Sequence, residues 1–304
     1  MLYAFTGGAD GANPAAYAAA GVIRDSAGNL YGTTRDGGTG YGVVFKLDTA
    51  GQETVLHSFT GGIDGAYPVG GVIRDSAGNL YGTAAAGGTA GAGVVFKVNK
   101  AGKQTVLYAF RGGDDGGNPD AGVIRDSAGN LYGTTQTYGA ENVGVVYKLD
   151  TAGNETVLHS FTGGADGGHP YPGGLIRDSA GNLYGTASNG GTANVGVVYK
   201  LNKAGKEKVL YSFTCSGGCY PDAGVIRDSA GNLYGTTTLG GGGSGVVFKL
   251  DTTGQETVLY SFTGGADGSI PYGGLISDPA GNLYGTTYYG GAANAGAVYK
   301  LTPQ

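Results

Sequence analysis

The sequence has no Trp, one Met, two Cys and three His among its 304 residues, and charged residues make up only 13% of it. So few charges, with a formal net charge of −5, exclude a highly charged disordered chain and give no broad basic surface for nucleic acid. No apolar run reaches the roughly 20 residues that a membrane-spanning helix needs. The opening MLYAFTGG lacks the charged start and apolar stretch of a signal peptide. We therefore expect no nucleic-acid partner and no membrane span.

Glycine is abundant, with 66 residues, but it does not recur at every third position, which excludes collagen. The sequence instead repeats itself about every 50 residues. The string RDSAGNLYGT and its variant SDPAGNLYGT place an aspartate at Asp25, Asp75, Asp126, Asp178, Asp228 and Asp278. Two further signatures follow each time, of the kinds GVVFKL (from Gly42) and ETVLHSF (from Glu53).

Each repeat predicts four short strands, lettered A to D, as in residues 21–25, 29–34, 42–48 and 53–59. These segments are rich in β-branched and aromatic residues and are bounded by Gly, Asp and Asn. Six such units predict an all-β fold, a six-bladed β-propeller with four antiparallel strands per blade. We expect a single domain over residues 1–304, with repeats at about 20–60, 70–111, 121–162, 173–214, 223–263, and 273–304 plus 1–6.

The last repeat lacks its strand D, and a matching segment, MLYAF, stands at the N-terminus instead. A closed ring explains this displacement, because residues 2–5 can then pair beside residues 298–301 and complete the last blade. Closure removes exposed sheet edges and fixes both termini. We expect a closed, monomeric ring.

The connections between strands fall into two groups. The A–B and C–D turns are short and nearly identical, and their Asp side chains are expected to accept backbone N–H bonds. The B–C and D–A connections are longer and varied, and antiparallel pairing puts them together at the opposite end of each blade. Functional residues usually lie on variable loops held by a rigid scaffold, so we expect the site at this loop end.

Two patterns recur in the D–A connections. A G-G-x-D-G motif supplies Asp10, Asp64, Asp115, Asp166 and Asp267. These carboxylates are candidates for Ca²⁺ binding, or they shape a Gly-rich turn, since calcium requires six to eight oxygen ligands. A tyrosine often follows, at Tyr17, Tyr67, Tyr171, Tyr220 and Tyr272. These rings are candidates for stacking on sugars, or they pack between blades.

A few residues break the repeat at the loop end. Asp120 and Asp222 occupy the same place, in the string PDAGVI, in two of the six units. A pair of carboxylates about 5 to 9.5 Å apart can cleave glycosides as acid and base. The alternative is a pair copied by duplication without a role. His169 is the only histidine that we place near the axis.

The two cysteines, Cys215 and Cys219, lie in the one D–A connection that lost G-G-x-D-G. A zinc site would need two more ligands, and none is nearby in the sequence. We expect a short local disulfide, which points to a location outside the cytoplasm.

The three signatures together resemble the "Gloeo-Verruco" (GloVer) tandem repeat family of bacterial proteins over almost the whole chain. GNLYG is also similar to the corresponding turn of NHL-type six-bladed propellers. The GloVer resemblance implies an extracellular or cell-surface protein and names no activity and no catalytic residues. Without a signal or an anchor, the chain is expected to be a trimmed segment or a designed, consensus-like ring.

We predict a rigid, non-catalytic extracellular module that binds or displays glycans at its loop end. The near-identity of the repeats favours this module, and also a scaffold without a ligand, over an enzyme. The alternative is a polysaccharide-cleaving hydrolase or lyase that uses Asp120, Asp222 and His169. A further alternative is a symmetric scaffold with no ligand.

Overall fold

The computed structural model describes residues 1–14, 21–170 and 173–302. These residues form 24 strands in six sheets, and no helix occurs among them. The protein is all-β and has the predicted six-bladed β-propeller fold, with one sheet per repeat. The chain divides into two compact units, Met1–Ser160 and Phe161–Gln304, and each unit contains three sheets.

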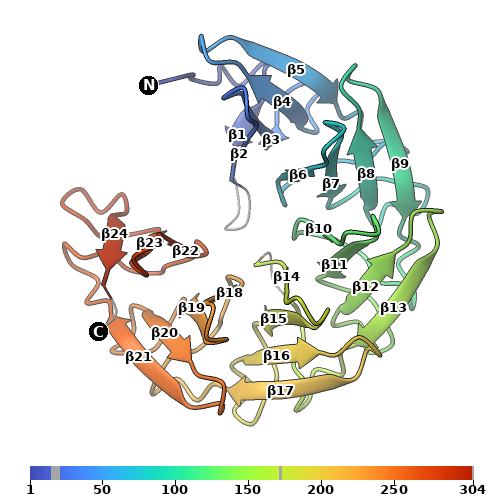
Figure 1. Ribbon diagram of the computed structural model, residues 1–304. Helices are drawn as coiled ribbons and strands as arrows, with labels where there is room; N and C mark the ends of the chain where they lie inside the picture. The colour runs from blue at the N-terminus through green and yellow to red at the C-terminus, as the bar shows by residue number, and fades with distance from the viewer. Residues whose placement is uncertain (15–20, 171–172, 303–304) are drawn as a thin grey trace. The chain divides into compact units, whose positions relative to one another are not determined.

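The three sheets of the first unit follow the order of the chain (Figure 1). The first contains β1 (Ala12–Pro14), β2 (Ile23–Arg24), β3 (Leu30–Asp36), β4 (Val43–Leu47) and β5 (Glu53–Ser58). The second contains β6 (Val72–Arg74), β7 (Leu80–Ala84), β8 (Val94–Val98) and β9 (Gln104–Ala109). The third contains β10 (Ile124–Arg125), β11 (Leu131–Thr135), β12 (Val145–Leu149) and β13 (Glu155–Ser160).

The second unit repeats this plan. Its first sheet contains β14 (Ile176–Arg177), β15 (Leu183–Ala187), β16 (Val197–Leu201) and β17 (Glu207–Ser212). The next contains β18 (Ile226–Arg227), β19 (Leu233–Thr237), β20 (Val246–Leu250) and β21 (Glu256–Ser261). The last contains β22 (Ile276–Ser277), β23 (Leu283–Thr286) and β24 (Val298–Leu301).

Neighbouring strands in every sheet are antiparallel, and strand A is only two or three residues long. The sequence did not predict β1, which pairs with β3 in the register Ala12↔Asp36. In later repeats, isolated bridges such as Ala66↔Ala86 take its place. These bridges tie each D–A connection to the B–C connection of its own repeat, so the variable loops are held by backbone hydrogen bonds.

Strand C forms the core because it is apolar at consecutive positions. In β8, Val94, Val95 and Phe96 are all fully buried, which requires a neighbouring sheet on both faces. The aromatic residue that follows strand D packs edge-to-face on strand C of the next repeat, as Phe59 does on Phe96 with ring centroids 5.1 Å apart. The same contact joins Phe110 to Tyr147 in the first unit, and Phe213 to Phe248 and Phe262 to Tyr299 in the second.

The N-terminal residues pack against the first sheet in this same way. The Phe5 ring lies edge-to-face on Phe45, with centroids 5.0 Å apart, and the Tyr3 hydroxyl donates to Asp10 as Tyr108 does to Asp115. Residues 2–5 thus contact the first sheet in the way that the strand D segment of each repeat contacts the sheet of the repeat after it. Their pairing with residues 298–301, which would complete the three-stranded last sheet, would join the two units and stays a prediction.

The short turns form as the sequence predicts. Asp25 accepts hydrogen bonds from the backbone N–H groups of Ala27 and Asn29, at 3.0 and 2.9 Å, and from the Tyr31 hydroxyl. Hydrogen bonds from Asn29, the side-chain amide foremost, lower the pKa of Asp25 to about 2. The Arg on strand A lies over a tyrosine of the preceding repeat, as Arg74 does over Tyr31 at 5.6 Å. These repeated polar residues therefore serve the scaffold.

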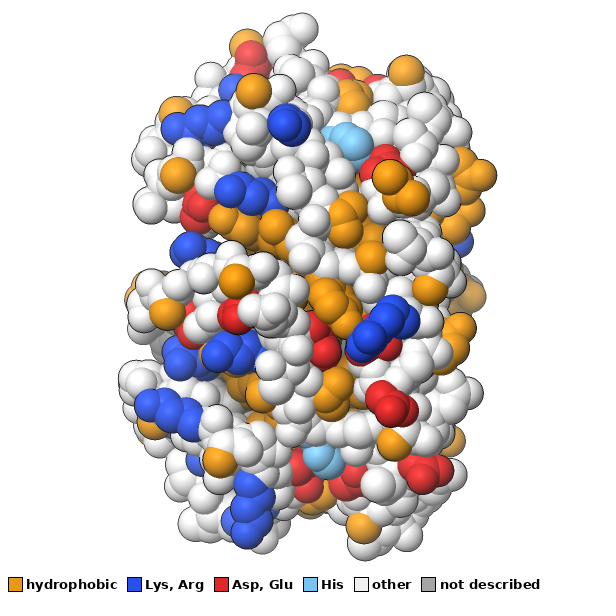
Figure 2. Space-filling model, turned by 90° about the vertical axis from the view of Figure 1, so that its right-hand side faces the viewer, with side chains coloured by type: hydrophobic (Ala, Val, Ile, Leu, Met, Phe, Trp, Pro, Cys, Tyr) orange, Lys and Arg blue, Asp and Glu red, His pale blue; other side chains and the backbone are white. Residues whose placement is uncertain are grey.

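Figure 2 shows the side of the molecule that lies on the right in Figure 1. Lys and Arg side chains gather mainly on one half of this side, and hydrophobic side chains show between the two halves. This side carries no continuous basic surface. Over residues 1–14, 21–170 and 173–302, the structure has no helix long and apolar enough to cross a bilayer.

Candidate active site at the loop end

In each D–A connection, the residue immediately before the proline lies in the left-handed region, with φ between 51° and 58°. These residues are Asn13, Tyr67, Asn118, His169, Tyr220 and Ile270. A left-handed backbone costs a non-glycine residue about 1–2 kcal/mol. The surrounding hydrogen bonds hold it there: the carbonyl of Tyr220, for example, accepts the N–H of Thr238 at 3.0 Å.

The partner in that bond is the second residue after the GNLYGT string, and it differs in all six repeats. The six residues are Arg35, Ala85, Gln136, Ser188, Thr238 and Tyr288. This position does not stand out in a search for acids, histidines or cysteines, because none of its six residues is of these types. The signal was available: the GNLYGT string repeats nearly unchanged, and the second residue after it is different in every copy. The fold thus places one varied side chain per repeat at the loop end.

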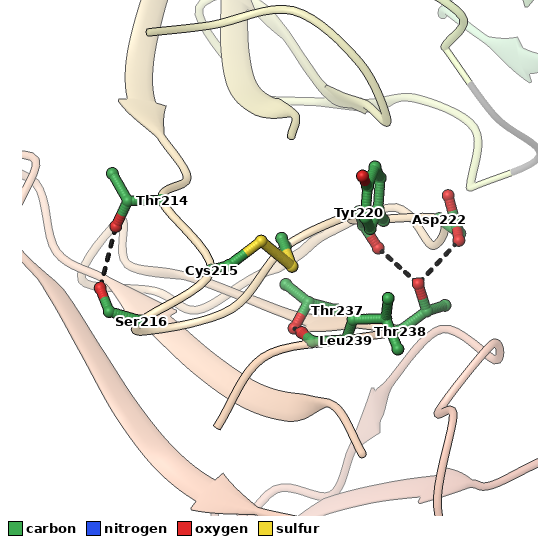
Figure 3. The surroundings of a disulfide bond; sticks show 9 residues. Thr214, Cys215, Ser216, Tyr220, Asp222, Thr237, Thr238 and Leu239 are labelled. Atoms are coloured by element: carbon green, nitrogen blue, oxygen red, sulfur yellow. Dashed lines mark hydrogen bonds between the residues drawn. A yellow bond between two sulfur atoms is a disulfide. The ribbon is translucent and has the colours of Figure 1, made fainter. Parts of the chain in front are cut away.

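In the second unit, this position brings Thr238 to Asp222. The Thr238 hydroxyl lies 3.0 Å from Asp222 Oδ2 and 3.1 Å from the carbonyl oxygen of Tyr220, as Figure 3 shows. The N–H of Asp222 also donates to the Tyr220 carbonyl, at 2.9 Å. Burial raises the pKa of Asp222 to about 6, although the Thr238 hydroxyl acts to lower it. Asp222 is therefore a half-buried carboxyl group that exchanges its proton close to neutral pH.

The Thr238 hydroxyl can serve both protonation states of this carboxyl group. When Asp222 is ionised, the hydroxyl donates its single hydrogen to Oδ2. When Asp222 is protonated, the acid can donate to the Thr238 oxygen, and the Thr238 hydrogen can turn to the Tyr220 carbonyl. The bond to the ionised form is the stronger of the two because it is charge-assisted. This arrangement suits a group that gives and takes a proton.

Asp120 is the matching carboxyl group in the first unit. Its N–H donates to the carbonyl of Asn118 at 2.9 Å, as Asp222 does to Tyr220. Burial raises the pKa of Asp120 to about 6, and the positive charge of Arg35 opposes the shift. Arg35 lies 5.1 Å from the Tyr67 ring centroid and forms an ion pair with Asp36 at 3.1 Å. Each unit thus has one such group; the predicted acid–base pairing of Asp120 with Asp222 would span the two units and stays a prediction.

The other predicted site residues take varied places. His169 occupies the left-handed position of its own connection, where its carbonyl accepts the Ser188 N–H at 3.2 Å. Tyr67 and Tyr220 occupy that same position, whereas Tyr272 lies two residues further along. Tyr17 and Tyr171 lie outside the described residues. The five tyrosines therefore do not share one equivalent position.

The aspartates of the G-G-x-D-G motif act as hydrogen-bond acceptors within their own connections. Asp267 accepts the Thr263 N–H at 2.8 Å, the Thr263 hydroxyl at 2.5 Å and the Tyr260 hydroxyl at 2.9 Å. These bonds, led by the Thr263 hydroxyl, lower the pKa of Asp267 to about 2. Corresponding bonds to a Thr or Arg at the start of the connection are found for Asp10, Asp64, Asp115 and Asp166. Within the described part of the chain, no three His, Cys, Asp or Glu side chains gather as metal ligands.

A disulfide replaces this aspartate in the fifth repeat. Cys215 and Cys219 are bonded, with their Cα atoms 4.5 Å apart, and Figure 3 shows the bond beside Tyr220 and Asp222. Cys219 pairs with Leu239 through two backbone hydrogen bonds of 2.9 and 3.2 Å. The disulfide therefore constrains the connection that leads into Asp222, and the hydrogen bonds of Cys219 to Leu239 anchor that connection to the segment that carries Thr238.

Comparison with known proteins places this site in context. The family model described as Gloeobacter/Verrucomicrobia repeat matches residues 1–144 and 121–304. The comparison with curated proteins found no match.

Several solved structures share the fold. A gluconolactonase from Xanthomonas campestris is 15% identical, with 93% of this chain and 84% of that chain covered and a TM-score of 0.51. A putative 6-phosphogluconolactonase from Bacteroides uniformis is 16% identical, with 86% and 75% covered and a TM-score of 0.55. A puromycin hydrolase is 12% identical, and the match spans 94% of this chain but 43% of that one, with a TM-score of 0.55.

These findings correct the prediction of a non-catalytic module that binds or displays glycans. The solved structures that resemble the chain bear the names of lactonases and hydrolases, which fits the alternative prediction of an enzyme better. The physical reason lies at the loop end. Near-identical repeats suggested a site without chemistry, but the fold half-buries Asp120 and Asp222 and brings their pKa values close to neutrality.

Proposed function

The chain belongs to the Gloeobacter/Verrucomicrobia repeat family, and from the site built on this scaffold we propose that it is a hydrolase of carbohydrate substrates. The observation that carries the proposal is the contact between the Asp222 carboxylate and the Thr238 hydroxyl at the loop end of the fifth repeat. A general base works best when its pKa lies near the working pH, and burial brings Asp222 there.

The proposed reaction uses Asp222 in its ionised form. The carboxylate accepts a proton from a water molecule as the water oxygen bonds to the electrophilic carbon of the substrate. Thr238 stabilises the protonated Asp222 by accepting its hydrogen bond. The bond from that carbon to the leaving oxygen then breaks, and Asp222 gives its proton to the leaving oxygen, which restores the carboxylate. The names of the structural neighbours, which include lactonases, support an attack of this kind on a sugar-derived substrate.

Removal of the carboxylate tests the proposal. In Asp222→Asn, the amide keeps the size of the side chain but cannot accept the proton, so hydrolysis should fall by roughly 10²- to 10⁴-fold. Release of reducing ends from a panel of polysaccharides, and acid release from sugar lactones, measure it. Asp120→Asn tests the matching group of the first unit in the same assays.

Asp114→Asn is the matched control, because Asp114 is an exposed aspartate in another D–A connection. It should hydrolyse every substrate at the rate of the unmodified protein. If the unmodified protein hydrolyses none of these substrates, or if Asp222→Asn is as active as Asp114→Asn, the proposal is wrong.

The pH dependence should move when Thr238 is changed. Activity is expected to rise with pH through about 6, as Asp222 ionises. Thr238→Val keeps the shape of the side chain but removes the hydroxyl that stabilises the ionised form, so the pKa of Asp222 rises and the rise in activity shifts to higher pH. The pH profile of kcat/KM measures the shift.

Thr237→Val controls for the loss of a hydroxyl nearby, because Thr237 donates to the Leu239 carbonyl at 2.8 Å. It should leave the midpoint of the pH profile in place. A profile that is the same in Thr238→Val and in the unmodified protein would show that Asp222 is not the titrating group.

We also propose an extracellular or cell-surface location. The support is the disulfide between Cys215 and Cys219, because disulfides persist in oxidising compartments. Immunodetection in fractionated cells of the source organism tests this, and recovery only from the cytoplasm would contradict it.

A further inference from the structure

Three tyrosine rings, two of them exposed and that of Tyr272 half-buried, form a cluster in the last repeat of the second unit, and we name it the tyrosine shelf: Tyr272, Tyr288 and Tyr289. The rings of Tyr288 and Tyr289 are perpendicular, with centroids 4.6 Å apart, and those of Tyr272 and Tyr288 are 6.2 Å apart. Tyr288 is 61% exposed and Tyr289 is 45% exposed. Large aromatic side chains are thus held together on the surface instead of in the core.

The backbone fixes the shelf in place. The N–H of Tyr288 donates to the Ile270 carbonyl at 3.0 Å, and the N–H of Tyr289 donates to the Ser269 carbonyl at 3.1 Å. Ser269 returns a hydrogen bond to the Tyr289 carbonyl at 2.8 Å. The two exposed rings therefore stand on a paired segment, and little conformational entropy is lost when a ligand settles on them.

No other repeat carries two aromatic residues at these positions. The counterparts of Tyr288 and Tyr289 are Arg35 and Asp36, Ala85 and Ala86, Gln136 and Thr137, Ser188 and Asn189, and Thr238 and Leu239. The shelf is therefore not needed to build a blade, because five blades form without it.

The shelf adjoins the repeat that carries Asp222. The N–H of Ile270 donates to the Ser244 carbonyl of the fifth repeat at 2.9 Å. The hydroxyl of Thr236, two residues before Thr238, donates at 3.2 Å to the carbonyl of Gly273, which follows Tyr272. Within the repeat plan, Tyr272 and Tyr288 hold the places that Asp222 and Thr238 hold one repeat earlier. A substrate with several linked units can therefore contact both.

We propose that the tyrosine shelf is a sugar-binding subsite that stacks a neutral pyranose ring of the substrate beside Asp222. A pyranose whose hydroxyls are equatorial presents flat C–H faces, which pack on aromatic rings, and its hydroxyls can bond to the phenol groups at the edge. The role in positioning a substrate depends on the proposed function, but the binding itself does not.

Binding is measured in the Asp222→Asn background, in which the ligand is not cleaved. The probes are cellohexaose and maltohexaose, titrated by calorimetry. Tyr288→Ala and Tyr289→Ala should each weaken binding of the better probe by roughly tenfold, which corresponds to about 1.4 kcal/mol lost with the contact to one aromatic ring. Tyr288→Phe keeps the ring and should bind within about threefold of its parent.

Tyr41→Ala is the matched control, because Tyr41 is an exposed tyrosine that packs on Tyr67 in the first unit, with centroids 5.8 Å apart. It should bind like its parent, and the melting temperatures of all variants should agree. Weakened binding by the shelf variants, in a protein that hydrolyses nothing, would uphold the shelf and refute the proposed function. Failure to bind either hexaose, or equal binding by Tyr288→Ala and Tyr41→Ala, would overturn the shelf.

Discussion

Replacing Phe213 by alanine is expected to cause a large loss of stability, about 3–5 kcal/mol. The Phe213 side chain is fully buried, and its ring packs edge-to-face on Tyr211 and on Phe248, with centroids 5.0 and 5.2 Å away. Truncation leaves a cavity between two sheets and removes both ring contacts. Urea denaturation followed by circular dichroism measures the shift in the midpoint.

Phe5→Ala provides the comparison. Phe5 makes the same edge-to-face contact with the next strand C, through Phe45, but Phe5 is only half-buried and lies in a mostly exposed N-terminal segment. Its removal should cost less than half as much. If Phe5→Ala and Phe213→Ala lost the same free energy of unfolding, burial around the aromatic contact would add nothing to its contribution. That result would contradict the argument that the buried core increases the cost of removing Phe213.

Replacing Gly224 by alanine is expected to have the second large effect. A Cβ atom at this position would lie 2.0 Å from the carbonyl oxygen of Gly173, in the preceding repeat, so one of the two backbones must move. Forced overpacking of this kind typically costs 1–3 kcal/mol or more. Because Gly224 follows Asp222 by two residues, the shift should also displace the carboxylate. A fall in melting temperature of about 2–5 °C, with reduced hydrolysis, is the expected result.

Gly274→Ala tests the same position of the last repeat. A Cβ atom there meets nothing within 4 Å, and its φ lies outside the left-handed region. The variant should melt with the unmodified protein. If Gly224→Ala also melts unchanged, then the close approach of the two connections does not limit the packing of neighbouring repeats.

The sequence predicts the fold well because the same strand and turn patterns recur in six repeats. Consecutive apolar residues in strand C require burial on both faces, and the Asp–Asn–Tyr set around Asp25 defines the A–B turn; the structure has both. It does not reveal β1, because Ala12–Pro14 has neither strand propensity nor alternation. Only tertiary pairing with β3 makes these residues a strand.

The site is less predictable, since it depends on which side chains meet across a connection. Asp222 was found from the sequence because it breaks the repeat, but its partner Thr238 is an ordinary residue sixteen positions away along the chain. The shift in the pKa of Asp222 comes from burial, which no spacing encodes. The disulfide, by contrast, could be predicted, because Cys215 and Cys219 lie close together in the one connection that lacks the G-G-x-D-G aspartate.

The left-handed residues before the prolines have a consequence for how this protein divides its stability. Ile270 is the most costly of them, because a β-branched side chain is the least tolerant of a positive φ. Glycine at these places would relax the backbone, yet none of the six copies has it. The loop end of every blade therefore contains at least one residue in an unfavourable backbone conformation, whereas the A–B and C–D turns at the opposite end are nearly identical among the repeats. The unfavourable conformations lower the free energy of unfolding at the end where substrates are expected, and the packing of the core offsets this loss.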